Sequence, residues 1–146
     1  MFTPQHSIKK ESFTLTQAIG LIVLIISAAS AAFVISVITV DVLFWGGHMP
    51  LRNTVFLWTN LLGHGLLIGA GMKLLRRKSH ANSLYIAGLG ILTLSAVVSP
   101  FPDVGVYLFL GWPAVLIYGI LGIGLFIGKR IEMAHRSTQS TELPSV

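Results

Sequence analysis

The charged residues of this chain gather in a few short segments, and long apolar stretches without charge separate them. Nine of the ten Lys and Arg residues fall into three clusters: Lys9 and Lys10; Lys73, Arg76, Arg77 and Lys78; and Lys129, Arg130 and Arg136. Charged residues make up 10% of the 146 residues, whereas soluble domains contain about 25%. This pattern is typical of a polytopic membrane protein.

Four apolar stretches are long enough to cross a bilayer as helices, because about 20 apolar residues span the hydrocarbon core. They cover approximately residues 15–44, 54–72, 83–99 and 104–128. In the last stretch Pro113 follows Trp112, so this helix either kinks there or starts there as a shorter helix. The first apolar run is longer than the core of a signal peptide, and we expect it to remain as a helix.

These stretches predict an all-α fold with four transmembrane helices in a compact bundle. The transmembrane domain covers residues 14–130, after a short N-terminal segment (1–13) and before a flexible C-terminal tail (131–146). Basic clusters lie at alternate ends of successive stretches, and Lys and Arg are retained on the cytoplasmic side of short loops. We therefore expect both termini and the middle loop to be cytoplasmic, and the loops that contain Arg52 and Asp103 to face outward.

Two features concern helix packing. Small residues four apart, which allow close approach of helices in lipid, occur in each stretch, and we expect packing at Gly65, Gly69, Gly124 and Gly128, with Ala28, Ala32 and Ser36 on the first stretch. Residues 61–69 also match residues 120–128 at six of nine positions. Two repeated helical hairpins would explain this match, and the high frequency of Gly, Leu and Ile in membrane helices would explain it equally well.

One polar group of residues lies inside an apolar stretch. Asn60 and His64 are one turn apart, and Asn53 and Gly71 share their arc of the helix. The structural interpretation is that neutral His64 forms a hydrogen bond to another helix, with Ser95, Thr93, Tyr118 or Ser36 as partner. The functional alternatives are a proton or substrate path from His64 to the outer end, and axial ligation of haem or a chlorin beside Gly63 and Gly65.

The main ionisable groups of the predicted outer end are Asp41, His48, Arg52 and Asp103. An ion pair between Asp41 and Arg52 that closes the first hairpin is the simplest interpretation, because a metal site needs three convergent ligands. Aromatic residues also gather there and predict an interfacial belt, with Phe44, Trp45, Phe56, Trp58, Phe101, Tyr107, Phe109 and Trp112 as its members.

Composition excludes several function classes. The chain has no cysteine, which excludes disulfides, thiolate metal sites and redox chemistry of a Cys pair. The basic residues flank apolar stretches and form no patch interleaved with aromatic residues, so no nucleic-acid partner is expected. No nucleophile, base and orienting group occur in a recognisable arrangement. We therefore expect a protein without enzymatic activity and without a bound cofactor or metal.

The function that fits these features is that of a small integral membrane protein of the inner or plasma membrane, an accessory or assembly subunit of a membrane complex. Its partners would be the lipid bilayer and other membrane subunits, or further copies of itself. The first alternative is a small homo-oligomeric transporter or channel with a polar path at His64. The second alternative is a cofactor-carrying electron-transfer subunit, which depends on His64 alone.

The charge pattern generates a test of topology. Single cysteines are introduced into this cysteine-free chain and probed in intact cells with a membrane-impermeant thiol reagent. Cysteines at positions 48 and 103 should react, and those at positions 9, 78 and 136 should react only after permeabilisation. Reaction at position 78 in intact cells would contradict the predicted orientation.

Overall fold

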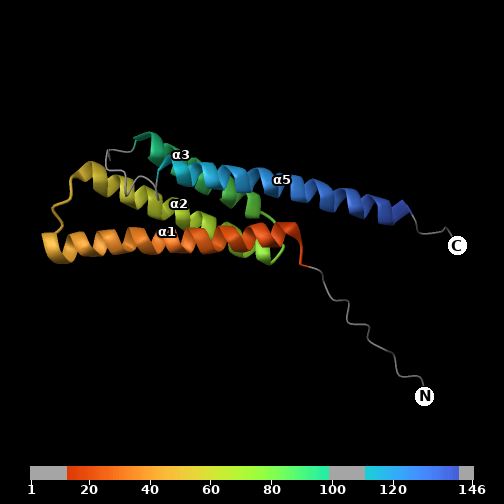
Figure 1. Cartoon of the computed structure of the whole chain (residues 1–146), viewed down its shortest axis with the longest axis horizontal. Helices are drawn as coiled ribbons and strands as arrows, with labels where there is room; N and C mark the ends of the chain where they lie inside the picture. Colours follow the sequence, from red (N-terminus) through yellow and green to blue (C-terminus); the bar gives the residue numbers. More distant parts are fainter. Residues whose placement is uncertain (1–12, 99–110, 142–146) are drawn as a thin grey trace, which may run out of the picture.

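The computed structural model describes residues 13–98 and 111–141, and these residues form four helices without any strand. The helices are α1 (Leu15–Trp45), α2 (Leu51–Leu75), α3 (Ala81–Val98) and α5 (Trp112–Thr141). Neighbours in this order run antiparallel, and together they build an elongated bundle (Figure 1). Helix α2 packs extensively on α1 and α3, whereas α5 contacts α1 and α3 less extensively. The predicted all-helical fold is thus confirmed.

Three of the four helices are long and apolar enough to cross a membrane. They are α1 over Leu15–Phe44, α2 over Leu51–Leu75 and α5 over Trp112–Ala134, whereas the apolar part of α3 is shorter, at Ala81–Val97. Helix α1 has 31 residues and is therefore about 46 Å long. This exceeds the roughly 30 Å of a hydrocarbon core.

The fourth helix differs in its bounds from the predicted stretch. It begins at Trp112, which agrees with the second of the two expectations for Trp112 and Pro113. Proline is favoured in the first turn of a helix, because its missing N–H has no partner there in any case. Residues 104–110 lie outside the described residues. At its other end α5 continues to Thr141, beyond the expected boundary at 130, because no Gly or Pro interrupts the sequence after Gly128 until Pro144.

Helix α1 is capped at both ends. Thr14 forms a capping box with Gln17: the Gln17 N–H donates to the Thr14 hydroxyl at 3.3 Å, and the Thr14 N–H donates to the Gln17 side chain at 3.1 Å. At the other end Gly46 adopts a left-handed conformation with φ of 67°, and its N–H donates to the carbonyl of Asp41. The two caps fix the ends of α1, and the cap at Gly46 fixes where the α1–α2 turn begins.

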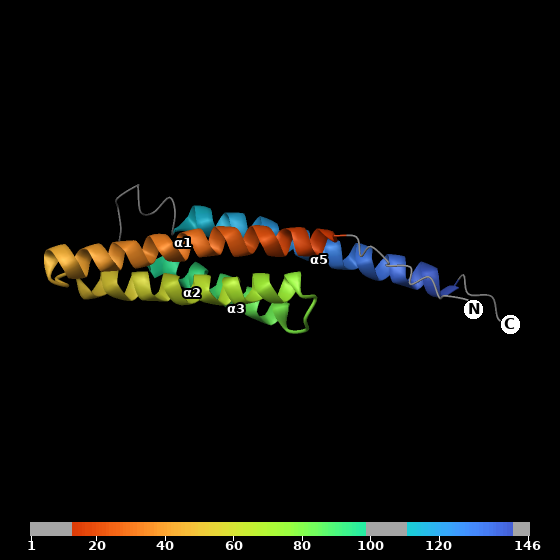
Figure 2. The same cartoon turned by 90° about the horizontal axis from the view of Figure 1, so that it is seen from below.

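Basic residues gather at one end of the bundle, which we call the basic end. It contains the start of α1, the end of α2, the start of α3 and the later part of α5, which projects beyond the other helices (Figure 2). Its basic residues are Lys73, Arg76, Arg77, Lys78, Lys129 and Arg130. The second sequence cluster and the described part of the third, which are far apart in the chain, thus lie at the same end, whereas Lys9 and Lys10 lie outside the described residues.

Glycines determine how closely α2 approaches its two main neighbours. A Cβ atom placed on Gly71 would lie 2.8 Å from the carbonyl oxygen of Gly20 on α1. On the other side, a Cβ atom on Gly88 of α3 would lie 3.0 Å from the carbonyl oxygen of Gly63. Backbone therefore contacts backbone at both interfaces, as is common between helices in lipid.

The four predicted packing glycines differ in their surroundings. Added Cβ atoms would contact Leu84 at 3.6 Å from Gly69, Ile19 at 3.3 Å from Gly124 and Leu15 at 3.4 Å from Gly128. The prediction for Gly65 is wrong within this chain, because a Cβ atom there would meet nothing within 4 Å. Gly65 is two residues from Gly63 and therefore points to the opposite side of α2.

The two segments with similar sequence use different faces. His64 and Leu67 are fully buried, whereas the residues aligned with them, Ile123 and Phe126, are each 63% exposed. A true repeat would place equivalent residues in equivalent surroundings. The burial pattern therefore gives the proposed hairpin repeat no support.

The glycine contacts predict opposite effects for two substitutions on the same helix. Gly71→Ala should lower the stability of the purified protein by about 1–3 kcal/mol, because its Cβ would meet the α1 backbone. Gly65→Ala should leave stability unchanged or raise it by up to about 1 kcal/mol, because alanine favours the helix and space is available. Thermal unfolding in one mild detergent measures both, and equal effects would contradict the assigned contacts.

Candidate functional site: a polar cluster inside the bundle

Asn60 and His64 both lie on the inner face of α2. Each side chain is fully buried, and Gly71 is buried on the same face, as the helical period predicted. Asn53, the fourth member of the predicted arc, is only partly buried. Because these polar groups are enclosed by four helices, their hydrogen bonds determine what the cluster is able to do.

His64 is bonded to Tyr118 of α5. The Tyr118 hydroxyl lies 3.3 Å from His64 Nδ1 and 2.9 Å from the hydroxyl of Ser27 on α1. Two consistent proton arrangements exist: Ser27 donates to Tyr118 and Tyr118 to Nδ1, or Nδ1–H donates to Tyr118 and Tyr118 to Ser27. In both arrangements three helices are joined by one continuous hydrogen-bonded chain.

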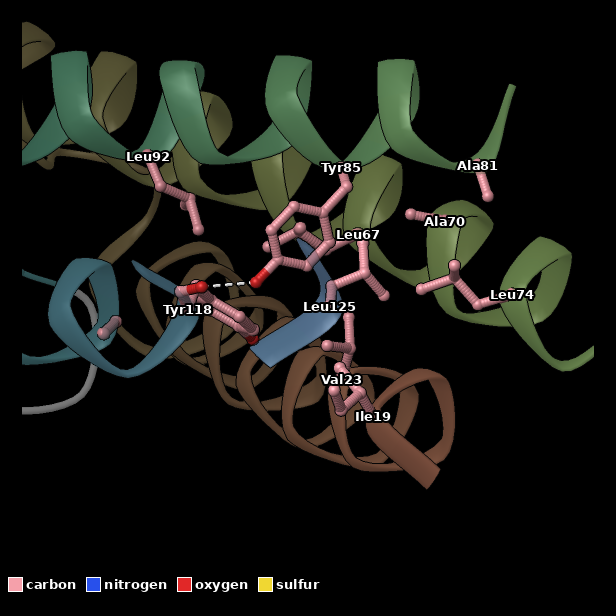
Figure 3. Packing of buried hydrophobic residues seen from close by; sticks show 11 residues of the cluster. Ile19, Val23, Leu67, Ala70, Leu74, Ala81, Tyr85, Leu92, Tyr118 and Leu125 are labelled. Atoms are coloured by element: carbon pink, nitrogen blue, oxygen red, sulfur yellow. Dashed lines mark hydrogen bonds between the residues drawn. The ribbon is translucent and has the colours of Figure 1, made fainter. Parts of the chain in front are cut away.

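Helix α3 is connected to this hydrogen-bonded group through Tyr85. Its hydroxyl donates to the backbone carbonyl of Tyr118, as the dashed line in Figure 3 shows. The ring of Tyr85 lies against Gly122, where an added Cβ atom would be 3.1 Å from Cε1. Gly122 therefore provides the space in which Tyr85 crosses from α3 to α5.

A second set of hydrogen bonds surrounds Asn60. Its amide nitrogen donates to the carbonyl of Phe56 at 3.0 Å and to the hydroxyl of Ser95 on α3 at 2.6 Å. The Ser95 hydroxyl lies 3.1 Å from that of Thr59, which in turn is 2.9 Å from the carbonyl of Val55. Since carbonyls only accept, the donor order runs from Asn60 to Ser95 to Thr59 to the backbone.

Two buried polar atoms of this cluster have no hydrogen-bond partner: Asn60 Oδ1 and His64 Nε2. They belong to residues one turn apart on the same face of α2. A buried polar atom without a partner costs about 1–3 kcal/mol. Among the described residues, these two atoms are therefore the one feature of the cluster that a purely structural role does not explain.

Apolar side chains enclose the polar cluster. Leu67 and Leu92 are fully buried in the core cluster that contains Tyr118, and Val23 of α1 and Leu125 of α5 belong to the same cluster (Figure 3). Gly63 packs against Leu92, and Gly65 points away from the core. The space for a macrocycle that the haem hypothesis assumed beside His64 is thus occupied by protein, and the residues do not fit that cofactor.

The structure selects among the predicted hydrogen-bond partners. Tyr118 is the partner of His64, and Ser95 is a partner of Asn60. Thr93 and Ser36 instead donate to carbonyls of their own helices. Sequence reasoning missed Ser27 and Tyr85. For Ser27 the reason is that α1 is apolar on all sides and offers no pattern from which the face of this serine could be predicted.

At the end opposite the basic end, the predicted residues are not brought together. Asp41 is buried beside Thr54 and Trp58, whereas Arg52 is exposed and lines a groove between α2 and α3. Within residues 13–98 no ion pair joins them, so that prediction is wrong, because the two side chains occupy different hollows. His48 is exposed in the turn, and Asp103 lies outside the described residues.

The predicted aromatic belt is partly described. Phe44 and Trp58 are exposed at this end, as is Trp112. The prediction that Phe56 belongs to the belt is wrong, because only 4% of this residue is exposed and it packs with Val34 and Leu57. The other predicted members are the side chain of Trp45, which is not described, and Phe101, Tyr107 and Phe109, which lie outside the described residues.

Within the described residues, no three His, Asp or Glu side chains lie close enough to hold a metal ion. Comparisons with known protein families, with curated proteins and with solved structures found no match. The function of this chain must therefore be argued from its own residues.

The polar cluster predicts unequal effects for two substitutions. Tyr118→Phe should lower stability by about 1–2 kcal/mol, because Ser27 and His64 both lose their partner. His64→Gln should cost less, since an amide retains one hydrogen bond to Tyr118. Thermal unfolding in detergent measures both, with the exposed Ser36→Ala as a control near zero. A larger loss for His64→Gln than for Tyr118→Phe would contradict the assigned network.

Proposed function

We propose that this chain is a small integral membrane protein of non-enzymatic type that works as an accessory or assembly subunit of a membrane complex. All four helices cross the inner or plasma membrane, and the basic end faces the cytoplasm with both termini. The position of the basic residues at one end supports this orientation, because such residues are retained on the cytoplasmic side.

The observation that carries the proposal is a face of α1 that the described residues of this chain leave uncovered. Ala28, Ala32 and Ser36 follow one another at four-residue spacing on α1, and all three are exposed. The Ser36 hydroxyl is bonded to the carbonyl of Ala32 at 2.9 Å, so this face offers a smooth surface with little free polarity. In the apolar part of α1 22% of the residues are buried, the same share as in α5, compared with 44% in α2.

A surface of this kind suits a second transmembrane helix. Between helices in lipid, association depends on close van der Waals packing, and small residues four apart permit it. The close contacts inside this chain use other residues, chiefly Gly20, Gly63, Gly71 and Gly88. Ala28, Ala32 and Ser36 are therefore available to a partner subunit, and α1 is the helix that docks.

The buried cluster supports a structural rather than an enzymatic role. Tyr118 separates Ser27 from His64 in the hydrogen-bonded chain, so serine is not activated directly by the imidazole as nucleophilic catalysis requires. The cluster also links all four helices. Its main effect is to fix the rotation of each helix, so that α1 presents the same face to its partner.

One observation favours a second candidate, a small homo-oligomeric transporter or channel. The groove between α2 and α3, with a volume of about 540 Å³, is lined mostly by apolar residues, and its polar residues are Arg52, Thr59 and Ser95. Ser95 is bonded to Asn60, and beyond it lie the two polar atoms without partners. These groups form a row of polar atoms from the groove to the centre of the bundle, which is the arrangement that a polar path needs.

Site-specific photo-crosslinking in cells tests the first candidate. A photoreactive amino acid at position 32 should crosslink to a different membrane protein, whereas one at the exposed position 116 on α5 should give no protein adduct. Ala32→Leu should abolish co-purification of that partner without lowering the thermal stability of the isolated chain, because Ala32 is exposed in it.

The other outcomes separate the candidates. Crosslinking at position 32 to copies of the same chain alone favours the homo-oligomeric transporter. That candidate also requires His64→Gln to remove activity in cells while the protein stays folded, because an amide does not titrate near neutral pH. Equal protein adducts at positions 32 and 116 would contradict the docking role of α1.

A further inference from the structure

Three segments that are distant in sequence enclose a small polar hollow at the basic end. The hollow has a volume of about 160 Å³ and is lined by Thr14, Thr16, Leu74, Arg77, Lys78, Lys129 and Glu132. Three of these residues are cationic, and Glu132 is the single anion among them. The lining therefore has an excess of positive charge, and an anionic group would be bound there in preference to a neutral one.

Local structure places the two cations of the α2–α3 turn. Arg77 adopts a left-handed conformation with φ of 51°, and the N–H of Lys78 donates to the carbonyl of Lys73 at 2.9 Å. Gln17 of α1 connects to this turn, because its amide donates to the carbonyl of Leu75 and its oxygen accepts from Arg77. The turn is thereby held against the start of α1.

Glu132 is held on the opposite side of the hollow. Its carboxylate accepts a hydrogen bond of 2.7 Å from the Thr16 hydroxyl. The carboxylate forms no ion pair with Lys129, because the Lys129 ammonium instead donates to the Asn82 side chain at 2.8 Å. Lys129 therefore bonds to a neutral amide, and no carboxylate of the described residues forms an ion pair with it.

A second, apolar groove begins at the same lysine. It lies between α3 and α5, has a volume of about 380 Å³, and Lys129 and Asn82 are its polar residues near the basic end. The others are mostly apolar: Tyr85, Ile86, Leu89, Gly119, Gly122, Ile123, Leu125 and Phe126. The groove exists because the contact of α5 with α3 is less extensive than that of α2 with α3. Gly119 leaves space in it, because an added Cβ atom there would meet nothing within 4 Å.

The depth of Lys129 fits the level of lipid headgroups. Lys129 follows Trp112 by 17 residues on α5, which corresponds to about 26 Å along the helix. With Trp112 at one interface, Lys129 is close to the other side of a hydrocarbon core about 30 Å thick. The polar hollow then lies at the headgroup level, and the α3–α5 groove lies in the hydrocarbon.

We infer that these two hollows together bind an anionic phospholipid. Its phosphate lies at Lys129 and Lys78, and one acyl chain lies in the α3–α5 groove. Phosphate is also available as a free ion, but a free ion would leave the adjoining apolar groove unused. Basic pockets between transmembrane helices on the cytoplasmic side are a known means of binding anionic headgroups. The inference depends on the membrane insertion and orientation proposed above.

The headgroup part is tested by native mass spectrometry of the purified protein in mild detergent. Phosphatidylglycerol, phosphatidylcholine with the same acyl chains, and inorganic phosphate are added separately. We expect phosphatidylglycerol to bind most tightly. Lys78→Gln and Lys129→Gln should each weaken its binding about fivefold, whereas Arg76→Gln and Lys73→Gln, which alter basic residues outside both hollows, should not.

Glu132→Gln provides a test of opposite sign. Glutamine retains an oxygen that accepts from Thr16 but removes the one negative charge of the lining. This variant should bind phosphatidylglycerol more tightly than the unmodified chain. Weaker binding, or an equal loss in the Arg76→Gln control, would overturn the assignment of the phosphate to this hollow.

The acyl-chain part is tested with a pair of glycine substitutions. Gly119 of α5 lines the groove, and a Cβ atom there would meet nothing within 4 Å. The same is true of a Cβ atom on Gly90 of α3, which does not line the groove. Gly119→Leu should fill the groove and weaken phosphatidylglycerol binding, whereas Gly90→Leu should not. Equal binding by both variants would show that the groove holds no acyl chain.

The remaining outcomes distinguish this inference from the proposed function. If inorganic phosphate binds as tightly as phosphatidylglycerol, or if phosphatidylcholine does, the phospholipid site is overturned while the membrane proposal stands. Reconstitution into phosphatidylcholine vesicles followed by alkaline carbonate extraction tests insertion alone. A chain that carbonate removes from the vesicles would overturn both.

Discussion

Close contact of helix backbones on both sides of α2 is the constraint on which the rest of this structure depends. At Gly71 the backbone of α2 meets that of α1 near Gly20, and at Gly63 it meets α3 near Gly88. Side chains at these positions would hold the helices apart. For a bundle inserted in lipid, which is as apolar as the helices themselves, dispersion contacts between close surfaces would provide much of the stabilisation. Close approach is what makes those contacts numerous.

Helices α1, α2 and α3 pack closely, whereas the position of α5 depends on polar contacts. Helix α5 packs less extensively on its neighbours, yet Tyr118 bonds to Ser27 and His64 and accepts a bond from Tyr85. Each such bond contributes little energy, but an incorrect rotation of α5 would leave several buried polar groups without partners, at a cost of about 1–3 kcal/mol each. The cluster thus favours one arrangement of α5 more strongly than it raises overall stability.

The loose contact of α5 also connects the two proposals. It leaves the α3–α5 groove open beside Lys129, while α1 keeps an uncovered face of small residues. One surface suits a lipid and the other suits a helix, because the first combines an apolar groove with positive charge and the second is smooth and nearly uncharged. A subunit of a membrane complex would use both surfaces at once.

By itself the sequence determined the helical class, the approximate bounds of the helices and the inner face of α2. These depend on properties read along the chain: the length of apolar stretches, the position of charges, and the period that places Asn60 and His64 on one face. Tertiary structure alone decided the partners. Helix α1 is apolar on all sides, so no period indicates that Ser27 faces inward or that Ala28 and Ala32 face outward. For the same reason Gly63 and Gly65 look alike in sequence, although only Gly63 is in close contact with a neighbouring helix. Which side of an evenly apolar helix is covered depends on the shapes of its neighbours, and those shapes exist only after the chain has folded.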